Sequence, residues 1–293
     1  EVKRGPLTLQ AYVVDDLEPG SPIAHKEAQF LRQHTNRKTI VALPTPCTIG
    51  DLMWHPEYSR AAYPTRESFV WACVPIIRDE VISLAKLGVD AIQLDEPLLP
   101  RLADPHTYGY DGLADLDEAA ELSVQTINEV AAGLDGLFLT VHLCHAHGDE
   151  YRATPGAENL MMSAVRRMEV DRFAMEFNSP AAQGLQALQD FPDDKVLGLG
   201  VIEPKSPVVE SPETVVRRGE KAREFVDAGH LVLNPDCGFA TSARRSSSLD
   251  RAYLKLTAMC RGAEMLREAH GSGARSRAGN VEWELDRVRQ EVR

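Results

Sequence analysis

The sequence predicts an α/β protein, a (β/α)8 barrel of the TIM type, of which six strands can be identified in the chain. Six short apolar segments alternate with helix-like stretches, which is the pattern of a parallel sheet covered by helices. Polar residues recur where the last four segments end, 29 to 32 residues apart, at Cys144, Glu176, Lys205 and Cys237. That spacing is the length of one strand–helix unit. No Gly-x-Gly-x-x-Gly turn opens a helix, so a barrel is favoured over a dinucleotide-binding sheet.

The six expected strands are mostly continuous apolar runs. They are TIVALPTP (39–46), AIQLDEP (91–97), LFLTVHLCH (137–145), RFAMEFN (172–178), VLGLGVIEPKS (196–206) and HLVLNPDCG (230–238). The helices expected between them cover residues 66–87, 114–133, 158–169 and 212–228. The last of these has a favourable start, with Ser211 as its cap and Pro212 in its first position.

We expect residues 1–270 to form a single barrel domain and residues 271–293 to form a polar linker and a C-terminal helix. Before the first strand, residues 7–14 alternate like a hairpin strand, and residues 19–37 indicate a loop and a short helix. Because only six barrel strands are identifiable, we expect either two more β/α units upstream of Glu1 or an unusual closure of the barrel.

Composition excludes several classes of protein. The formal net charge of −12 argues against binding to a nucleic-acid backbone, and no apolar run is long enough for a membrane helix. The first residues contain no signal-peptide core. Five widely spaced cysteines do not form a disulfide framework, so we expect a cytoplasmic protein. The oligomeric state is left open, with a homodimer as the assembly considered.

A metal site is indicated at the ends of three strands. His142 and Cys144 are two residues apart in a strand, so their side chains point to the same side. Glu176 and Cys237 end two other strands, and a barrel would bring all four residues to its mouth. One nitrogen, two sulfurs and one oxygen suit tetrahedral zinc. The alternative is two buried structural cysteines, a core histidine and a solvated glutamate.

The donor set points to a particular chemistry. Two thiolate ligands make zinc a weak activator of water but a good ligand for a substrate thiol, which loses its proton on binding and stays nucleophilic. Glu176 is the ligand that such a thiol would displace. The reaction class that follows is alkyl transfer to sulfur.

Other polar residues are expected at the same mouth. Asp95 and Glu96 follow a buried strand and could bind an amino or hydroxyl group, although an acidic start to a helix is the alternative. Lys205 is a candidate proton donor or anion anchor, with a solvated lysine as the alternative. Asp236 precedes Cys237 and could orient it.

The remaining cysteines are interpreted as structural. Cys73 and Cys260 lie in helical apolar patterns, and Cys47 has no metal-binding partner nearby in the sequence, so all three are expected in the core. His145 and His147 are expected in a loop at the mouth.

Six motifs in series resemble the catalytic domain of cobalamin-independent methionine synthase and its shorter relatives. They are LPTPCTIG, QLDEPLL, VHLCH, AMEF, GLGVIEPKSP and LVLNPDCGFAT, and they span roughly residues 39–241. The resemblance implies a β/α barrel that transfers a methyl group to the sulfur of homocysteine. It implies that Asp95 contacts the homocysteine amino group and that zinc is held by four residues, namely His142, Cys144, Glu176 and Cys237.

The chain departs from the family pattern around the methyl donor. Lys205 stands where the synthases carry a proton-donating histidine, and Arg101 stands where a glutamate contacts the pteridine. The tryptophan that stacks on folate aligns with Leu52, with Trp54 two residues on.

We therefore expect the thiol and zinc site to be retained, with either a methylfolate or a methylcorrinoid as donor. Asp95 and Lys205 are the expected catalytic residues. The expected substrate-binding residues are Asp95, Glu96, Trp54, Arg101 and Asp236. The alternatives are an alkyltransferase or lyase acting on another thiol, like epoxyalkane:coenzyme M transferase, and a barrel that binds zinc without catalysis.

Overall fold

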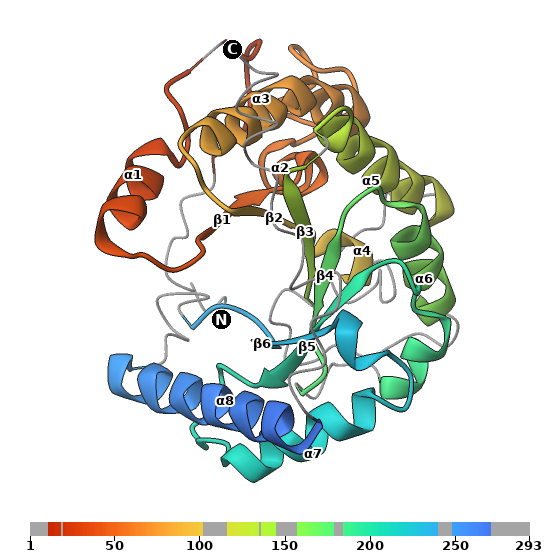
Figure 1. Ribbon diagram of the computed structural model, residues 1–293. Helices are drawn as coiled ribbons and strands as arrows, with labels where there is room; N and C mark the ends of the chain where they lie inside the picture. Colours follow the sequence, from red (N-terminus) through yellow and green to blue (C-terminus); the bar gives the residue numbers. More distant parts are fainter. Residues whose placement is uncertain are drawn as a thin grey trace, which may run out of the picture.

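The computed structural model describes residues 11–18, 20–101, 116–134, 136–144, 157–178, 184–239 and 248–270. Within them, six strands form one parallel sheet whose spatial order follows the sequence (Figure 1). The strands are β1 (Ile40–Pro44), β2 (Ala91–Asp95), β3 (Phe138–Leu143), β4 (Arg172–Met175), β5 (Val196–Ile202) and β6 (Leu231–Pro235). All six predicted strands are confirmed, and so is the α/β class of the fold.

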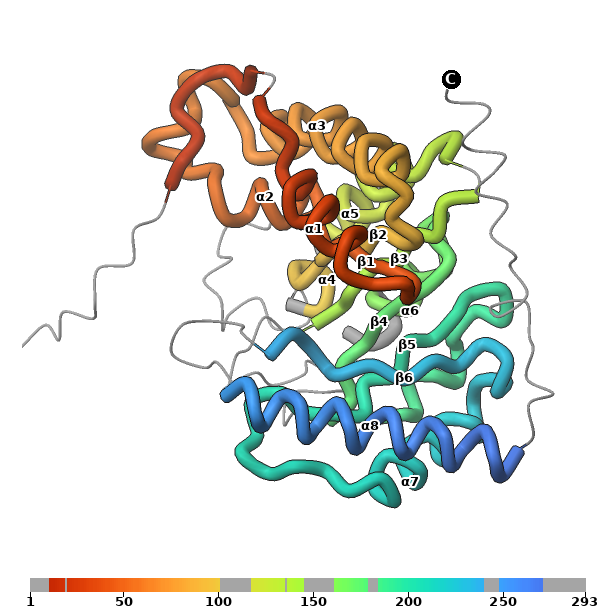
Figure 2. Tube along the Cα trace, turned by 60° about the vertical axis from the view of Figure 1, so that its left-hand side comes forward, coloured from red at the N-terminus to blue at the C-terminus, as the bar shows by residue number. Residues whose placement is uncertain are grey.

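Helices cover the outer side of the curved sheet (Figure 1). They are α1 (His25–His34), α2 (Pro46–Met53), α3 (Arg66–Lys86), α4 (Leu98–Arg101), α5 (Leu116–Ala131), α6 (Ala157–Arg167), α7 (Pro212–Ala222) and α8 (Leu249–His270), with short 3-10 helices at Leu185–Asp190 and Ala228–His230. Figure 2 shows α7 and α8 side by side, with α8 next to β6. None of the described helices combines the length and apolar character needed to cross a bilayer.

Local sequence explains where the helices begin and end. Thr65 caps α3 by accepting the N–H of Ser68, and Ser211 caps α7 as predicted. The chain leaves α3 through Gly88, whose φ of +82° favours glycine. The helix predicted at 212–228 is too long, because α7 ends at Ala222 and Asp227 then starts a turn by accepting the N–H of Gly229 at 2.7 Å.

Strand β5 depends on glycine to pack closely against its two neighbours. All seven residues of β5 are buried between β4 and β6. A Cβ atom on Gly200 would lie 2.1 Å from Asp236 Oδ1 and 2.7 Å from the carbonyl oxygen of Met175. The same holds for Gly198, where a Cβ atom would meet Asn234 Oδ1 at 2.3 Å. Side chains on the neighbouring strands therefore occupy the space that these two glycines leave.

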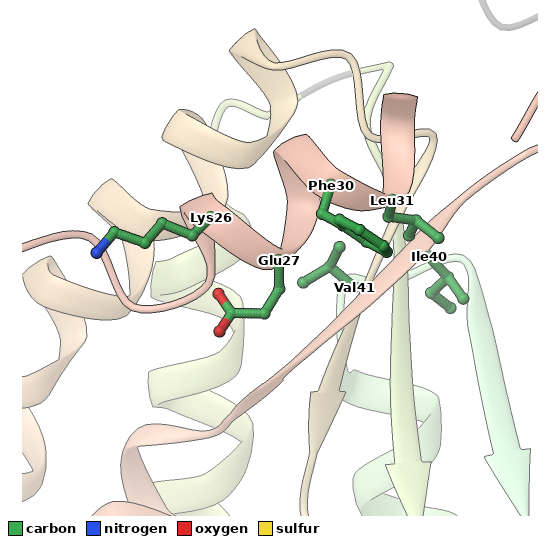
Figure 3. Close-up of a pocket in the computed structure, with 6 residues that line it drawn as sticks. All are labelled: Lys26, Glu27, Phe30, Leu31, Ile40 and Val41. Atoms are coloured by element: carbon green, nitrogen blue, oxygen red, sulfur yellow. The ribbon is translucent and has the colours of Figure 1, made fainter. Parts of the chain in front are cut away.

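The two outer strands pair on one side only within the described residues. An apolar cavity of about 540 Å³ lies beside β1, where Phe30 and Leu31 of α1 approach Ile40 and Val41 (Figure 3). A second cavity of about 470 Å³ lies between β6 and α8. The two further strands of an eight-stranded barrel are not among the described residues.

Of the elements predicted at the two ends of the chain, the structure confirms one, contradicts part of another and leaves the rest undescribed. Residues 7–10 and the expected linker and helix at 271–293 lie outside the described residues. The hairpin strand predicted at 7–14 is wrong for residues 11–14, which adopt no strand. Instead, the Val13 N–H donates to the carbonyl of Met53 at 2.8 Å, because this segment lies against the end of α2. The short helix expected within 19–37 is confirmed as α1.

Candidate active site

Three donor side chains meet at the carboxyl ends of the strands. His142 is the second-last residue of β3, Cys144 directly follows β3, and Cys237 lies two residues beyond β6. Their nitrogen and sulfur atoms all lie within 4.8 Å of one another. In a flat sheet, β3 and β6 would be about 14 Å apart, three times the strand spacing. The curvature of the sheet is therefore what assembles this group, which has the composition of a metal-binding site (Figure 1).

The imidazole of His142 is held in a defined orientation. Its Nδ1 lies 3.1 Å from the carbonyl oxygen of Ala174 on β4, so Nδ1 carries the proton and donates it. Burial acts to lower the pKa of His142, but a hydrogen bond and charge from Cys237, together with the charge of Asp95, outweigh it and raise the pKa. A backbone acceptor on one ring nitrogen is the usual way to orient a metal-binding histidine.

Glu176 directly follows β4 and is buried. Among the described residues, its carboxylate does not belong to the group of donor atoms within 4.8 Å. The role of Glu176 as fourth ligand therefore stays a prediction.

Asp236 ties the end of β6 to the segment after β4. Its side chain is 1% exposed, and its carboxylate accepts the backbone N–H groups of Phe177 at 3.2 Å and Asn178 at 3.0 Å. The side-chain amide of Asn178 also donates to it at 2.9 Å. Burial above all, and also the charge of Glu176, raise the pKa of Asp236 to about 7. These contacts with the protein's own donors suit a residue that orients its neighbour Cys237.

Asp95 faces the same group from β2. It is half-buried and aligned in the sheet with His142, and its Oδ1 accepts from the side-chain amide of Gln93 at 2.8 Å. Burial raises the pKa of Asp95, with a further contribution from the charge of Cys237, while the charge of His142 opposes the rise. The structure thus brings Asp95 to the edge of the donor group.

Glu96, the next residue, points into the protein and is fully buried. The hydroxyl of Thr45 lies 2.6 Å from its Oε2, and the N–H of Leu98 donates to its Oε1 at 3.1 Å. Burial raises the pKa of Glu96 to about 7. Its contacts connect the ends of β1 and β2 to α4.

Lys205 lies in the turn after β5 and is partly exposed. Burial raises the pKa of the nearby Glu203 carboxyl, and the positive charge of Lys205 opposes that rise. The two side chains therefore interact electrostatically, as an ammonium and a carboxylate at the mouth of the sheet.

The sequence matches the family model described as "Cobalamin-independent synthase, Catalytic domain" over residues 6–264. That range covers most of the chain and includes every element of the site. The chain belongs to this family.

Curated members of the cobalamin-independent synthase family include relatives named Methionine synthase. The protein of that name from Pyrococcus horikoshii is 29% identical over 262 residues, which is 88% of this chain and 66% of the relative. The one from Saccharolobus islandicus is 25% identical and covers 78% of this chain and 58% of the relative. This chain thus spans about two thirds of the length of such relatives or less.

Solved structures support the same fold. The B12-independent methionine synthase from Shewanella sp. W3-18-1, determined in complex with selenomethionine, matches with a TM-score of 0.68 and 23% identity, covering 86% of this chain and 69% of that one. A methyltransferase from Methanosarcina mazei matches with a TM-score of 0.55 and 14% identity, covering 86% and 71%. With the parallel sheet and its outer helices, these likenesses confirm the β/α barrel class of fold.

Trp54 and Arg101 are the two residues predicted to lie near the methyl donor, and the structure describes the side chain of Trp54 only. Trp54 directly follows α2 as its C-cap, and its indole N–H donates to the carbonyl of Tyr63 at 3.0 Å while the ring packs against the core around Phe69. Its contacts are those of a side chain that anchors the loop after α2. Arg101 is the last residue of α4, and its side chain lies outside what the structure describes. A role for either residue in binding the donor stays a prediction.

The other cysteines divide into two kinds. Cys47 and Cys73 are buried as predicted, and burial raises the pKa of each thiol to about 12. The prediction for Cys260 is wrong, because this residue is exposed on α8. The apolar face of α8 that carries Cys260 borders the cavity beside β6 instead of packing into the core. His145 and His147 lie outside the described residues.

The structure adds two residues that the sequence reasoning missed. Asn178 bridges Asp236 and the carbonyl oxygen of Gly200, to which its amide donates at 2.5 Å. Gly200 leaves the space that the Asp236 carboxylate fills. The alternating glycines of VLGLG were the available signal, since a glycine inside a strand often marks a close approach of another group.

Proposed function

We propose that this chain is a zinc-dependent methyltransferase that transfers a methyl group to the thiol of homocysteine, forming methionine. The observation that carries the proposal is the compact His142, Cys144 and Cys237 group in a member of this family. Relatives and a solved structure that bear the name methionine synthase support the choice of reaction.

The donor group fits zinc. With zinc–ligand bonds of about 2.0 to 2.3 Å, tetrahedral geometry separates ligand atoms by about 3.3 to 3.8 Å. Donor atoms within 4.8 Å of one another need only small side-chain adjustments to reach that arrangement. Glu176 is proposed as the fourth ligand, because it is buried and directly follows β4, the strand next to β3.

Zinc bound here would lower the pKa of a substrate thiol while leaving its sulfur nucleophilic. The protein residues then have separate tasks. Asp95 would hold the homocysteine amino group, because its half-buried carboxylate lies at the edge of the donor group. Asp236 and Asn178 hold the loop of Cys237 in place. Lys205 would donate a proton to the group that leaves when the methyl is transferred.

The methyl donor is proposed to be a methylfolate or a methylcorrinoid. A stacked pteridine needs an open aromatic face, and the Trp54 ring is engaged with the core and with Tyr63. The experiment below therefore tests methylfolates and a methylcorrinoid as methyl donors separately. We also assign the protein to the cytoplasm, because none of its five cysteines forms a disulfide and two of them would serve as metal ligands.

The decisive experiment combines metal analysis with a donor and acceptor screen. The zinc-loaded protein is tested with homocysteine and with coenzyme M as acceptors, against methylfolates and methylcobalamin. We expect Cys144→Ser and Cys237→Ser to lose most of their zinc and to lower methyl transfer to homocysteine by at least about 100-fold. The matched control is Cys260→Ser, which makes the same change at an exposed site.

Several results would contradict the proposal. Full zinc content and full activity in Cys144→Ser or Cys237→Ser would rule out the metal site. Transfer to coenzyme M but not to homocysteine would favour an alkyltransferase of another thiol. Zinc binding with no methyl transfer from any donor to any thiol would favour a barrel that binds zinc without catalysis.

A further inference from the structure

A buried ammonium lies behind the segment that carries Lys205. Lys255 is on α8, far from Lys205 in sequence, and its side chain is fully buried. Its Nζ donates to the carbonyl oxygen of Val208 and to Glu210 Oε2, the latter at 2.7 Å. Glu210 is itself nearly buried, with 8% of its side chain exposed. An ion pair so shielded from water is costly to form unless its geometry is well defined.

The second oxygen of Glu210 extends this contact to the start of the same segment. Glu210 Oε1 accepts the backbone N–H of Glu203 at 2.9 Å. Arg218 on α7 lies 3.8 Å from that oxygen and donates to the carbonyl of Val201 at 2.7 Å. The network therefore holds the chain on both sides of Lys205, at Val201 and Glu203 before it and at Val208 and Glu210 after it.

Within the segment 203–210, only Pro204 is buried, and the Val208 N–H donates to the hydroxyl of Ser206 at 3.2 Å. The segment forms no helix or strand, and Pro207, Val208 and Val209 are exposed. Its apolar side chains at 208 and 209 therefore contribute little burial that could hold it in place. The contacts from α7 and α8 therefore restrain the part of the segment after Pro204, where packing contributes little.

We propose that Lys255, acting with Glu210, is a positioning residue that fixes the segment 203–210 and so places Lys205 at the mouth of the sheet. This inference rests on the proposed function, in which Lys205 is the proton donor. It assigns to α8 a task in catalysis although no residue of α8 belongs to the donor group.

The test compares three variants. Lys255→Met removes the ammonium, and Lys255→Met combined with Glu210→Leu removes both charges, so that no unpaired carboxylate remains buried. Arg261→Met is the matched control, because Arg261 is also on α8 but its pair with Glu264 is exposed, at 70% and 55%. Hydrogen exchange reports the Glu203 amide directly, and steady-state kinetics and zinc content report the site.

In the double variant we expect the Glu203 amide to exchange about tenfold faster or more, since the carboxylate that accepts its N–H is removed. In Lys255→Met we expect a rise in the same direction, since Glu210 keeps its carboxylate but loses the ammonium that holds it in place. We expect kcat for methyl transfer to fall about tenfold or more, because a displaced catalytic group loses its alignment. The KM for homocysteine and the zinc content stay within about twofold of the wild-type values. Arg261→Met behaves like the wild type in all four measurements.

The proposal is overturned if the Glu203 amide keeps its wild-type exchange rate in the double variant. It is also overturned if exchange is faster while kcat is unchanged, or if kcat falls only in parallel with zinc content. If Lys255→Met does not fold, the double variant provides the comparison. A wild-type protein that transfers no methyl group would refute the proposed function, whereas the exchange data would still test how the segment is held.

Discussion

The orientation of His142 is set by the protein itself. The carbonyl oxygen of Ala174 accepts a hydrogen bond from Nδ1 of His142. The other ring nitrogen is then available to interact with Cys237. Asp236 is held in a similar way by two backbone N–H groups and the amide of Asn178. At the scale of single residues, the site is organised by groups that do not belong to the donor set.

Glu96 makes the stability of the protein depend on pH. Burial raises its pKa from 4.5 to about 7. Between these values the folded state binds a proton that the unfolded state has released, so the free energy of unfolding falls as the pH rises through this window. Glu96→Gln removes this contribution, and its stability relative to the wild type should increase by up to about 3 kcal/mol between pH 4.5 and pH 8.

Urea unfolding of both proteins at several pH values measures this difference. The matched control is Glu129→Gln, at an exposed position of α5, whose stability should run parallel to the wild type. Parallel curves for Glu96→Gln as well would contradict the prediction. The comparison between variant and wild type isolates Glu96 from Asp236, whose pKa is raised in the same direction.

At the scale of elements, β5 links the two halves of the site. It lies between β4, which leads to Glu176, and β6, which leads to Cys237. Its glycines let the carboxylate of Asp236 and the amide of Asn178 meet across the strand. The path from β5 to α7 is held by Glu210 and Lys255. The geometry of the mouth thus depends on how closely neighbouring strands approach β5.

Gly200→Ala tests that dependence. The added methyl group would lie 2.1 Å from Asp236 Oδ1, so the carboxylate and the loop of Cys237 must move. We expect a loss of about 1 to 3 kcal/mol in the free energy of unfolding and at least tenfold weaker zinc binding. Gly20→Ala is the control, since nothing lies within 4 Å of its added methyl group. Wild-type stability and zinc affinity in Gly200→Ala would contradict this account.

At the scale of the whole molecule, curvature brings together strands that are not neighbours. β3 and β6 are separated by β4 and β5, and yet their ends supply donor atoms within 4.8 Å of one another. The outer strands β1 and β6 each border a cavity, and the one beside β1 is mainly apolar. A metal ion at the mouth would therefore join two distant parts of one curved sheet.

Zinc should accordingly stabilise the whole fold. A ligand present at about 1,000 times its Kd adds about 4 kcal/mol to the free energy of unfolding, which corresponds to a rise in Tm of about 10 °C for a protein of this size. Thermal unfolding with zinc and after chelation measures the change. A Cys144→Ser, Cys237→Ser double variant should show the same Tm under both conditions. An equal Tm for the wild type with and without zinc would contradict the prediction.

Much of the fold and of the donor group could be predicted from the sequence, because the patterns of residue types that indicate them lie within single strand–helix units. The apolar runs identified all six strands, and Ser211 with Pro212 identified the start of α7. The residue types at the strand ends predicted the His142, Cys144 and Cys237 group. Strand period and donor chemistry are local properties, so the amino-acid sequence by itself determines them.

The tertiary structure decided what depends on contacts between units. The apolar pattern around Cys260 predicted that its side chain is buried. In the structure this side chain is exposed, because it borders the cavity between α8 and β6. Likewise, only the folded chain shows that Trp54 donates to Tyr63 and that Lys255 pairs with Glu210. The Lys255–Glu210 pair joins residues 45 positions apart, and the Trp54 hydrogen bond depends on how the loop after α2 folds back on itself. Both contacts need the chain to be folded, so no local pattern of residue types encodes them.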